Sequence, residues 1–112
     1  MPLSRSFKST VKARADSDAA FRAAILREGV ESLLAGDVDK AKSALRTYIN
    51  ATVGFDALAE RTGTPSKSLM RMFGPRGNPS ARNLSMVLQQ LQRNSGVSLS
   101  VRSSQARKRA VR

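Results

Sequence analysis

The chain has 112 residues and a net charge of +12, from 20 Lys and Arg against eight Asp and Glu. This length suffices for one small domain with a single hydrophobic core. The chain has no cysteine and no histidine. It therefore lacks disulfides, thiolate metal sites, the commonest catalytic base and the commonest transition-metal ligand. No apolar run approaches the ~20 residues of a membrane span, and no signal peptide is recognisable, so we expect a soluble cytoplasmic protein.

The charge is distributed unevenly along the chain. All eight acids lie between Asp16 and Glu60, whereas residues 61–112 contain eleven Lys or Arg and no acid. Such asymmetry favours a polyanionic partner for the second half, with nucleic acid the first candidate. A basic surface that only maintains solubility is the alternative, but a complete lack of acids over nearly half the chain fits it poorly.

The first elements are expected in the half that carries the acids. Residues 1–16 are polar and basic, with few apolar anchors beyond Phe7 and Val11, so we expect a mobile arm or a frayed first helix. An N-terminal helix is predicted over residues 17–36, with Ser17 or Asp18 as N-cap and Gly36 at its end. Its inward positions are predicted to be Phe21, Ile25, Leu26, Val30, Leu33 and Leu34.

Four further helices are predicted. Asp37 caps a helix ending near Gly54, and two short helices follow over Phe55–Thr62 and Pro65–Phe73. A last helix runs from an N-cap at Ser80 to near Gly96. The first of these four is expected to bury Val38, Ala41, Leu45, Tyr48, Ile49 and Thr52, leaving Lys40, Lys42 and Arg46 outside that stripe.

The C-terminal residues alternate between apolar and polar. Val97–Arg102 is predicted to be a strand. Because a lone strand is not stable, we expect it to pair with a second copy in a dimer or with a partner protein. Residues 103–112 are predicted to be a basic tail.

The break between the two short helices has a specific interpretation. Two short helices joined by a tight turn containing glycine form a helix-turn-helix. Gly63 is the predicted turn residue, since it adopts positive φ at little cost. Thr64 is expected to cap the second helix, with Pro65 at its first position, where a missing N–H costs nothing.

The second of these helices presents a polar face. Leu69, Met72 and Phe73 are predicted to face the core. The opposite side would reach base edges in a DNA major groove, and its candidate base contacts are Ser66, Lys67, Met70 and Arg71. A short surface helix in an ordinary bundle is the alternative, which the lack of acids in this half makes less favourable.

The loop "GPRGNPS", residues 74–80, suggests phosphate contacts. Arg76, Asn78 and Arg82 surround the predicted start of the last helix, whose free N–H groups favour an anion. A P-loop is excluded because no GK[ST] sequence follows. The candidate phosphate contacts are Thr64, Ser68, Arg76, Asn78 and Arg82. A loop that merely connects two helices is the alternative.

Several short motifs carry a family resemblance. They are L-A-x-x-T-G at Leu58–Gly63, S-L at Ser68–Leu69, G-N-P at Gly77–Pro79 and L-S-V at Leu99–Val101. Over residues 37–102 the chain resembles antitoxins of the HigA or addiction-module-antidote type, which have a Cro/lambda-repressor-like helix-turn-helix. The resemblance implies an all-α fold: a five-helix lambda-repressor-like helix-turn-helix domain with an extra N-terminal helix and a short C-terminal strand.

The resemblance also implies a function. Proteins of this type repress their own operon and neutralise a small RelE-like ribonuclease toxin. Because this chain has one recognition helix and an unpaired predicted strand, we expect it to bind double-stranded DNA as a homodimer on an inverted repeat. Because such toxins are basic, the expected toxin contacts are the carboxylates of the acidic half, Glu28, Glu31, Asp37 and Asp39.

Other functions were weighed against this one. A repressor without a toxin partner shares every feature except the toxin. A basic RNA-binding protein is a further alternative, but the chain has only five aromatic residues to stack on bases, and the four in predicted helices are placed inward. An enzyme is least favoured, since no His or Cys is present and no pair of carboxylates suggests acid–base chemistry. No cofactor and no metal is expected.

Overall fold

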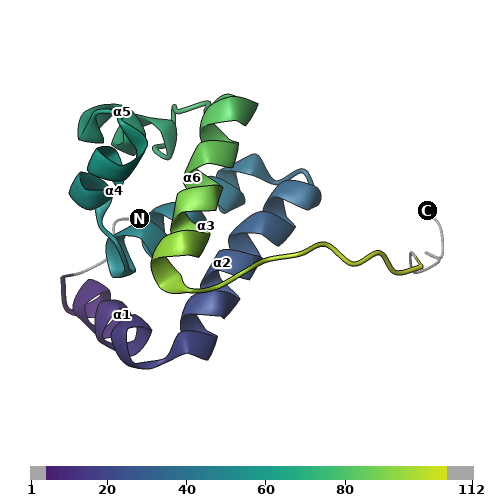
Figure 1. The fold of residues 1–112 in the computed structure, drawn as a ribbon, viewed down its shortest axis with the longest axis horizontal. Helices are drawn as coiled ribbons and strands as arrows, with labels where there is room; N and C mark the ends of the chain where they lie inside the picture. The colour runs from purple at the N-terminus through teal and green to yellow at the C-terminus, as the bar shows by residue number, and fades with distance from the viewer. Residues whose placement is uncertain (1–4, 106–112) are drawn as a thin grey trace.

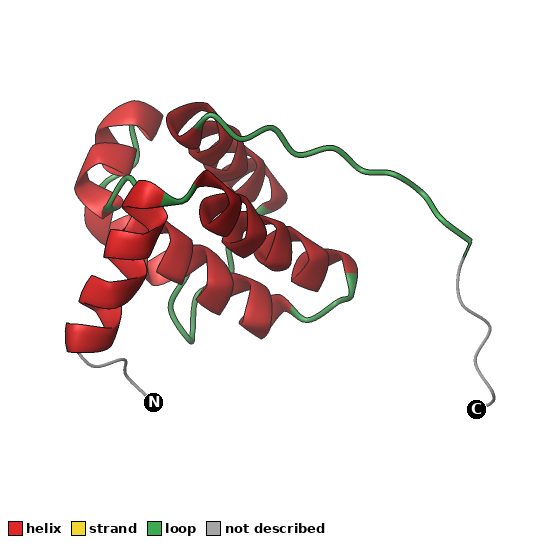
Figure 2. Cartoon of the chain, turned by 90° about the horizontal axis from the view of Figure 1, so that it is seen from below, coloured by secondary structure: helices red, strands yellow, loops and turns green. Residues whose placement is uncertain are grey.

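The computed structural model describes residues 5–105, and all its regular elements are helices (Figures 1 and 2). This confirms the predicted all-α class. The six helices of the described residues are α1 Arg5–Ser17, α2 Ala19–Leu34, α3 Val38–Ala51, α4 Phe55–Thr62, α5 Ser66–Met72 and α6 Ala81–Ser95. No helix among these residues is both long enough and apolar enough to cross a membrane.

A single core joins the helices from α2 onward. Tyr48 of α3 and Phe73, which follows α5, are its largest fully buried side chains. Each of the helices α3, α4, α5 and α6 contributes at least one fully buried apolar residue. Burying such a side chain contributes roughly 1.5–3 kcal/mol, so the two short helices are held mainly by the core. Its buried members are Leu26, Leu45, Tyr48, Ile49, Phe55, Leu58, Leu69, Phe73, Val87 and Leu91.

α2 and α3 pack closely along their length (Figure 1). Gly29 is buried at their contact, and a Cβ placed there would come within 2.9 Å of Leu45 Cδ2. Both helices start as predicted, because Asp18 accepts a hydrogen bond from Phe21 N and Asp37 accepts one from Lys40 N, each at 3.1 Å. The lack of a side chain at Gly29 thus allows α3 to approach α2 closely.

Two residues expected in the core lie on the surface. Leu34 is 70% exposed and Val38 is 46% exposed. Leu34 is the last residue of α2 and Val38 the first of α3. Both lie at the turn where this pair of helices ends, so no neighbouring element covers them. The helical period was right, but it carries no information on where the covering helix stops.

The basic N-terminal segment is helical rather than an extended arm. α1 spans Arg5–Ser17, and Ala15 on it is fully buried. The Arg22 guanidinium donates a hydrogen bond to the Ala15 carbonyl, and Arg14 lies 4.6 Å from the centre of the Phe21 ring. Phe7, Val11 and Ala15 recur at intervals of four, which gives α1 one side to place against α2 and α3. Of the two forms expected for residues 1–16, a mobile arm or a first helix, the structure shows the helix from Arg5 onward, and residues 1–4 lie outside the described residues.

The predicted strand is not formed. Residues 97–105 run away from the helices as an extended segment without regular structure (Figure 1). Val97 and Leu99 pack against the core, and Gln92 Oε1 accepts a hydrogen bond from Leu99 N at 2.9 Å. A strand needs a second strand to bond to, and the described part of this single chain supplies none. Most of the predicted basic tail lies outside the described residues.

Tyr48 gives a direct test of the core. It is the only tyrosine, and its hydroxyl donates a hydrogen bond to Ser95 Oγ. Burial raises the pKa of this hydroxyl above 10.0, and the Ser95 hydrogen bond and the Arg22 charge offset only part of that effect. The folded state therefore holds the Tyr48 proton more tightly than the unfolded state does.

We predict that the free energy of unfolding falls as the pH rises above about 10, since there the folded state binds more protons. Tyrosinate absorbance will show a higher ionisation midpoint in the folded protein than in concentrated guanidinium chloride. Tyr48→Phe should show a shallower loss of stability over the same range, because the variant lacks the phenol and is otherwise unchanged in its titratable groups. Equal midpoints in the folded and unfolded protein would contradict the burial.

Candidate nucleic-acid interface

The turn between α4 and α5 is built on a left-handed glycine. Gly63 has φ 74° and ψ 15°, and its N–H donates to the Ala59 carbonyl at 2.9 Å. This conformation is strained for residues with a Cβ, which confirms Gly63 as the turn residue. α4 ends at Thr62 as predicted.

The start of α5 differs from the prediction by one residue. Pro65 occupies the N-cap position with ψ 143°, and its carbonyl accepts a hydrogen bond from Leu69 N at 3.1 Å. Thr64, expected to be the cap, instead bonds Thr62 Oγ1 through its backbone N–H. Proline suits either position, because neither requires its missing N–H.

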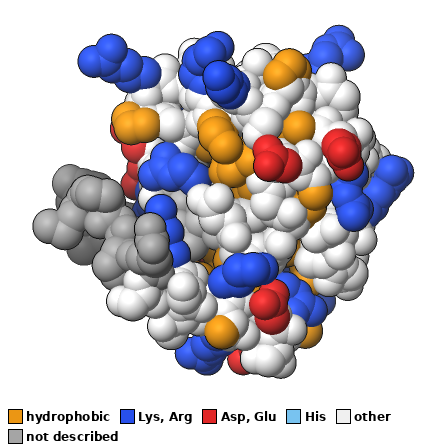
Figure 3. All heavy atoms as spheres, turned by 90° about the vertical axis from the view of Figure 1, so that its left-hand side faces the viewer, with side chains coloured by type: hydrophobic (Ala, Val, Ile, Leu, Met, Phe, Trp, Pro, Cys, Tyr) orange, Lys and Arg blue, Asp and Glu red, His pale blue; other side chains and the backbone are white. Residues whose placement is uncertain are grey.

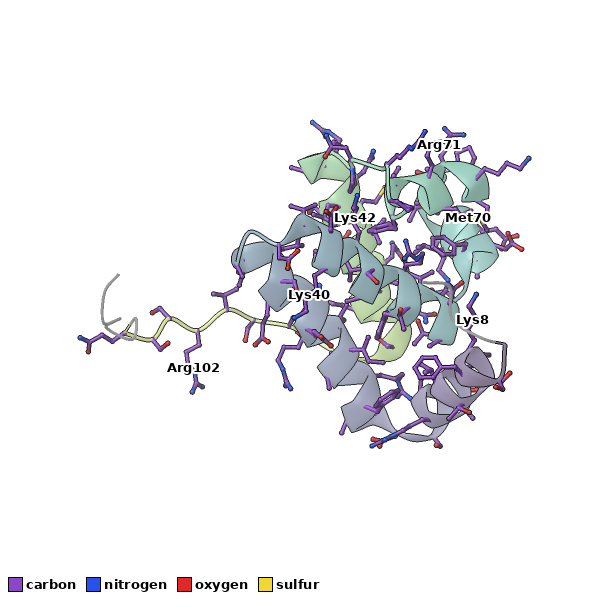
Figure 4. All side chains as sticks on the ribbon, turned by 180° about the vertical axis from the view of Figure 1, so that it is seen from behind. Lys8, Lys40, Lys42, Met70, Arg71 and Arg102 are labelled. Atoms are coloured by element: carbon purple, nitrogen blue, oxygen red, sulfur yellow. The ribbon has the colours of Figure 1, made fainter. Side chains whose placement is uncertain are left out.

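α5 has one buried and one exposed side. Leu69 and Phe73 are fully buried, and Met72 packs against the core at its edge. Lys67, Met70 and Arg71 are exposed, with 49% of Met70 accessible (Figure 4). Three of the four predicted base contacts thus share the outward side of α5.

Ser66 departs from that face. Its Oγ is buried and makes no hydrogen bond with the described residues. Ser66 therefore cannot contact a base edge in this conformation. Ser68 is half-buried on the same short helix. The spacing of Ser66 places it on the predicted side of the helix axis, but position around the axis alone does not predict that its Oγ is buried.

The predicted phosphate contacts lie mainly in the loop after α5 and at the start of α6. Arg76, Asn78 and Arg82 are exposed, whereas Thr64 is half-buried. Ser80 caps α6 as predicted by accepting a hydrogen bond from Asn83 N at 3.1 Å. In Figure 3, Lys and Arg side chains stand along the upper edge, the α5 end of the molecule, with acidic side chains below them.

Two basic residues of α3 position this loop. Lys42 is 7% exposed, and its Nζ donates to the carbonyls of Gly77 at 2.7 Å and Pro75 at 3.4 Å. The Arg46 guanidinium donates to the Phe73 carbonyl. The prediction that both lie outside the buried stripe is wrong for Lys42, and Arg46 is half-buried. A signal existed: Lys42 precedes Leu45 and Ile49 by three and seven positions, which places it on their side of the helix.

Gly77 is required where the loop folds back on α5. A Cβ placed there would lie 2.0 Å from the Arg71 carbonyl oxygen and 2.3 Å from that of Met72. At Gly74 the nearest atom is the Met70 carbonyl oxygen at 3.4 Å. Both glycines are followed within two residues by proline and lie against backbone atoms of α5, but only at Gly77 would a Cβ overlap those atoms.

We predict that Gly77→Ala lowers the free energy of unfolding by more than about 2 kcal/mol, since overpacking costs typically 1–3 kcal/mol even against side chains. Gly74→Ala is the matched control and should change stability by less than about 1 kcal/mol. Urea unfolding followed by circular dichroism measures both. Equal effects of the two substitutions would contradict the close approach at Gly77.

The Lys42 contacts give a second prediction. Lys42→Met keeps most of the buried stem but leaves the Gly77 carbonyl without its donor, at a cost of about 1–3 kcal/mol of stability. Lys40→Met is the control, because Lys40 is exposed and its side chain makes no hydrogen bond or ion pair with residues 5–105. The 3.5 Å ion pair of Lys42 with Asp39 adds little, since Asp39 is 91% exposed. Denaturant unfolding that gave the two variants equal stability would refute the positioning role.

The four carboxylates expected to contact a toxin differ in the interactions they make. Glu28, Glu31, Asp37 and Asp39 are all exposed. Asp37 is committed to the cap of α3, and Asp39 pairs with Lys42. No group of three or more potential metal-binding side chains occurs among the described residues.

Comparison with known proteins adds no relative. No protein-family model, no curated protein and no solved structure matches the chain.

Proposed function

We propose that this protein is a sequence-specific DNA-binding transcriptional regulator that inserts α5 into the major groove. The observation that carries the proposal is the helix pair α4–α5, joined at left-handed Gly63, with Lys67, Met70 and Arg71 exposed on the side of α5 away from the core. The proposed arrangement is that of a lambda-repressor-like helix-turn-helix, with α3 to α6 as its framework.

The dimensions of α5 suit this role. An α-helix is about 10–12 Å across with its side chains, which matches a major groove about 12 Å wide. Lys67 and Arg71 lie four positions apart on one face, so they would reach neighbouring bases. Each is suited to the O6 and N7 acceptors of guanine, and Met70 between them is suited to a thymine methyl.

Arg76 and Arg82 would contact phosphates of the DNA backbone beside the groove that α5 enters. They are exposed in the loop after α5 and in the first turn of α6. Contacts of this kind set the register of the protein on DNA without reading sequence. Lys42 and Arg46 would act indirectly, by fixing the loop that carries Arg76.

The proposed unit is a homodimer. One α5 per chain reads one half-site, and two half-sites about 34 Å apart make an inverted repeat. The extended segment from Val97 to Arg102 offers backbone groups for pairing two copies, apart from Leu99 N, which already bonds Gln92 Oε1. We place this activity in the cytoplasm, as the antitoxin of a toxin–antitoxin module, on the resemblance of residues 37–102. The toxin, a basic RelE-like ribonuclease, would then use the exposed carboxylates Glu28 and Glu31.

The test is selection of binding sites from random duplex DNA, followed by affinity measurement on the selected site and on random duplex. We predict an inverted repeat bound by two chains. Lys67→Ala and Arg71→Ala should each weaken binding to the selected site by roughly 1–3 kcal/mol and relax preference at one base position.

Arg93→Ala is the matched control. This substitution removes the same charge from the far end of α6. It should weaken binding to the selected site and to random duplex equally and only slightly. Enrichment of no duplex sequence, or preference for single-stranded RNA, would reject the proposal. If Lys67→Ala and Arg71→Ala lowered affinity equally for all sequences, α5 would contact phosphates and the assignment of base contacts would be wrong.

A further inference from the structure

A groove that the proposed DNA-binding role does not use lies between α1, α2 and α3. It has a volume near 930 Å³ and is partly open to solvent. Ligand pockets typically have roughly 300–1,000 Å³. Its apolar lining comes from all three helices and includes Phe7 and Val11 of α1, Phe21 and Ile25 of α2 and Ala44 of α3.

The charged residues of the groove are mostly basic. Lys8 and Lys12 of α1 and Lys40 and Arg46 of α3 line it, with Glu28 the one acid among its lining residues. Lys12 pairs with Asp16 at 3.6 Å, but no ion pair joins Lys8, Lys40 or Arg46 to a carboxylate within residues 5–105. Figure 4 shows Lys8 on α1 and Lys40 on α3. The groove thus combines an apolar interior with cationic groups that lack a counter-charge.

We propose that this groove binds a small amphiphilic anion, an alkyl chain that ends in a carboxylate. The chain would displace water from the apolar walls, since burial of apolar surface is the main favourable term. The carboxylate would bond the Arg46 guanidinium or the ammonium groups of Lys8 and Lys40, because charge-assisted hydrogen bonds are the stronger kind. A neutral or cationic amphiphile lacks the second contribution.

Arg46 connects this groove to the proposed DNA-binding helix. It lines the groove, and its guanidinium also bonds the Phe73 carbonyl at the end of α5. A carboxylate accepts a hydrogen bond more strongly than a carbonyl does. A bound ligand would therefore draw Arg46 away from Phe73, loosen the end of α5 and weaken DNA binding. This consequence, unlike ligand binding itself, rests on the proposed function.

The binding experiment uses sodium laurate below its micelle concentration, titrated into the full chain by calorimetry. We expect one molecule per chain with micromolar affinity, and at least tenfold weaker binding of both acetate and dodecyltrimethylammonium. Lys8→Glu/Lys40→Glu should lower the laurate affinity at least tenfold. Arg27→Glu/Arg93→Glu makes the same change of net charge at exposed positions that do not line the groove and should leave the affinity within twofold.

Other results would overturn the proposal. Equal losses in the two double variants would mean that laurate follows net charge alone. Binding of a synthetic helical peptide of Glu and Leu in place of laurate would assign the groove to a protein partner. Thermal unfolding of each variant checks that it is folded, and Val11→Asp, which places a carboxylate within the groove, supplies a second test that should abolish laurate binding.

DNA binding is measured separately, with and without laurate. A several-fold loss of DNA affinity that Arg46→Met abolishes supports the link through Arg46. Unchanged DNA affinity with laurate bound overturns that link. A chain that binds laurate but no DNA refutes the proposed function and leaves the groove proposal standing, whereas a chain that binds DNA but no laurate refutes the groove alone.

Discussion

The carbonyl groups that follow α5 must find hydrogen-bond donors, and the arrangement of the candidate interface depends on how they do so. α5 has seven residues, too few for a helix to persist alone in water. Leu69 and Phe73 attach it to the core, but apolar contacts do not orient a loop. Lys42 and Arg46 supply that orientation, because their donors meet the carbonyls of Phe73, Pro75 and Gly77. These two basic residues of α3 thus make their hydrogen bonds within the protein.

α3 consequently serves both halves of the molecule. On one side Leu45 packs over Gly29 of α2, where there is no room for a side chain. On the other side Lys42 and Arg46 hold the loop after α5. Arg46 in addition lines the groove beneath α1. A change in the position of α3 would therefore alter the groove and the candidate interface together.

Local signals in the sequence were sufficient to place most helix ends. Asp18, Asp37 and Ser80 cap as their side chains predict, and Gly63 and Gly96 end α4 and α6 with positive φ. These outcomes depend on residues within one turn. The outward positions of Lys67, Met70 and Arg71 follow from the same helical period that buries Leu69.

The remaining features depend on tertiary contacts, which a single sequence does not reveal. Lys42 is buried where it donates to two carbonyls of a distant loop, those of Pro75 and Gly77, although lysine is ordinarily exposed. The Ser66 Oγ is buried, although its position around the helix axis predicts an exposed side chain. Ala15 of α1 is fully buried, whereas the polar composition of this segment suggests an arm. The missing information was the position of the elements that pack against these residues.

In the segment from Val97 to Val101, a tertiary contact that the sequence pattern predicted is missing. Its alternation is real, since Val97 and Leu99 pack inward while Val101 is 79% exposed. Gly96 directs the chain out of α6 with φ 67°, and Gln92 bonds Leu99 N. The side chains thus have the pattern of a strand, and the backbone lacks only a neighbour to bond. A second copy presents the same segment, and antiparallel pairing of the two would satisfy both backbones at once and cover Val101. The segment in a single chain therefore already has the extended conformation that pairing in the proposed dimer would require.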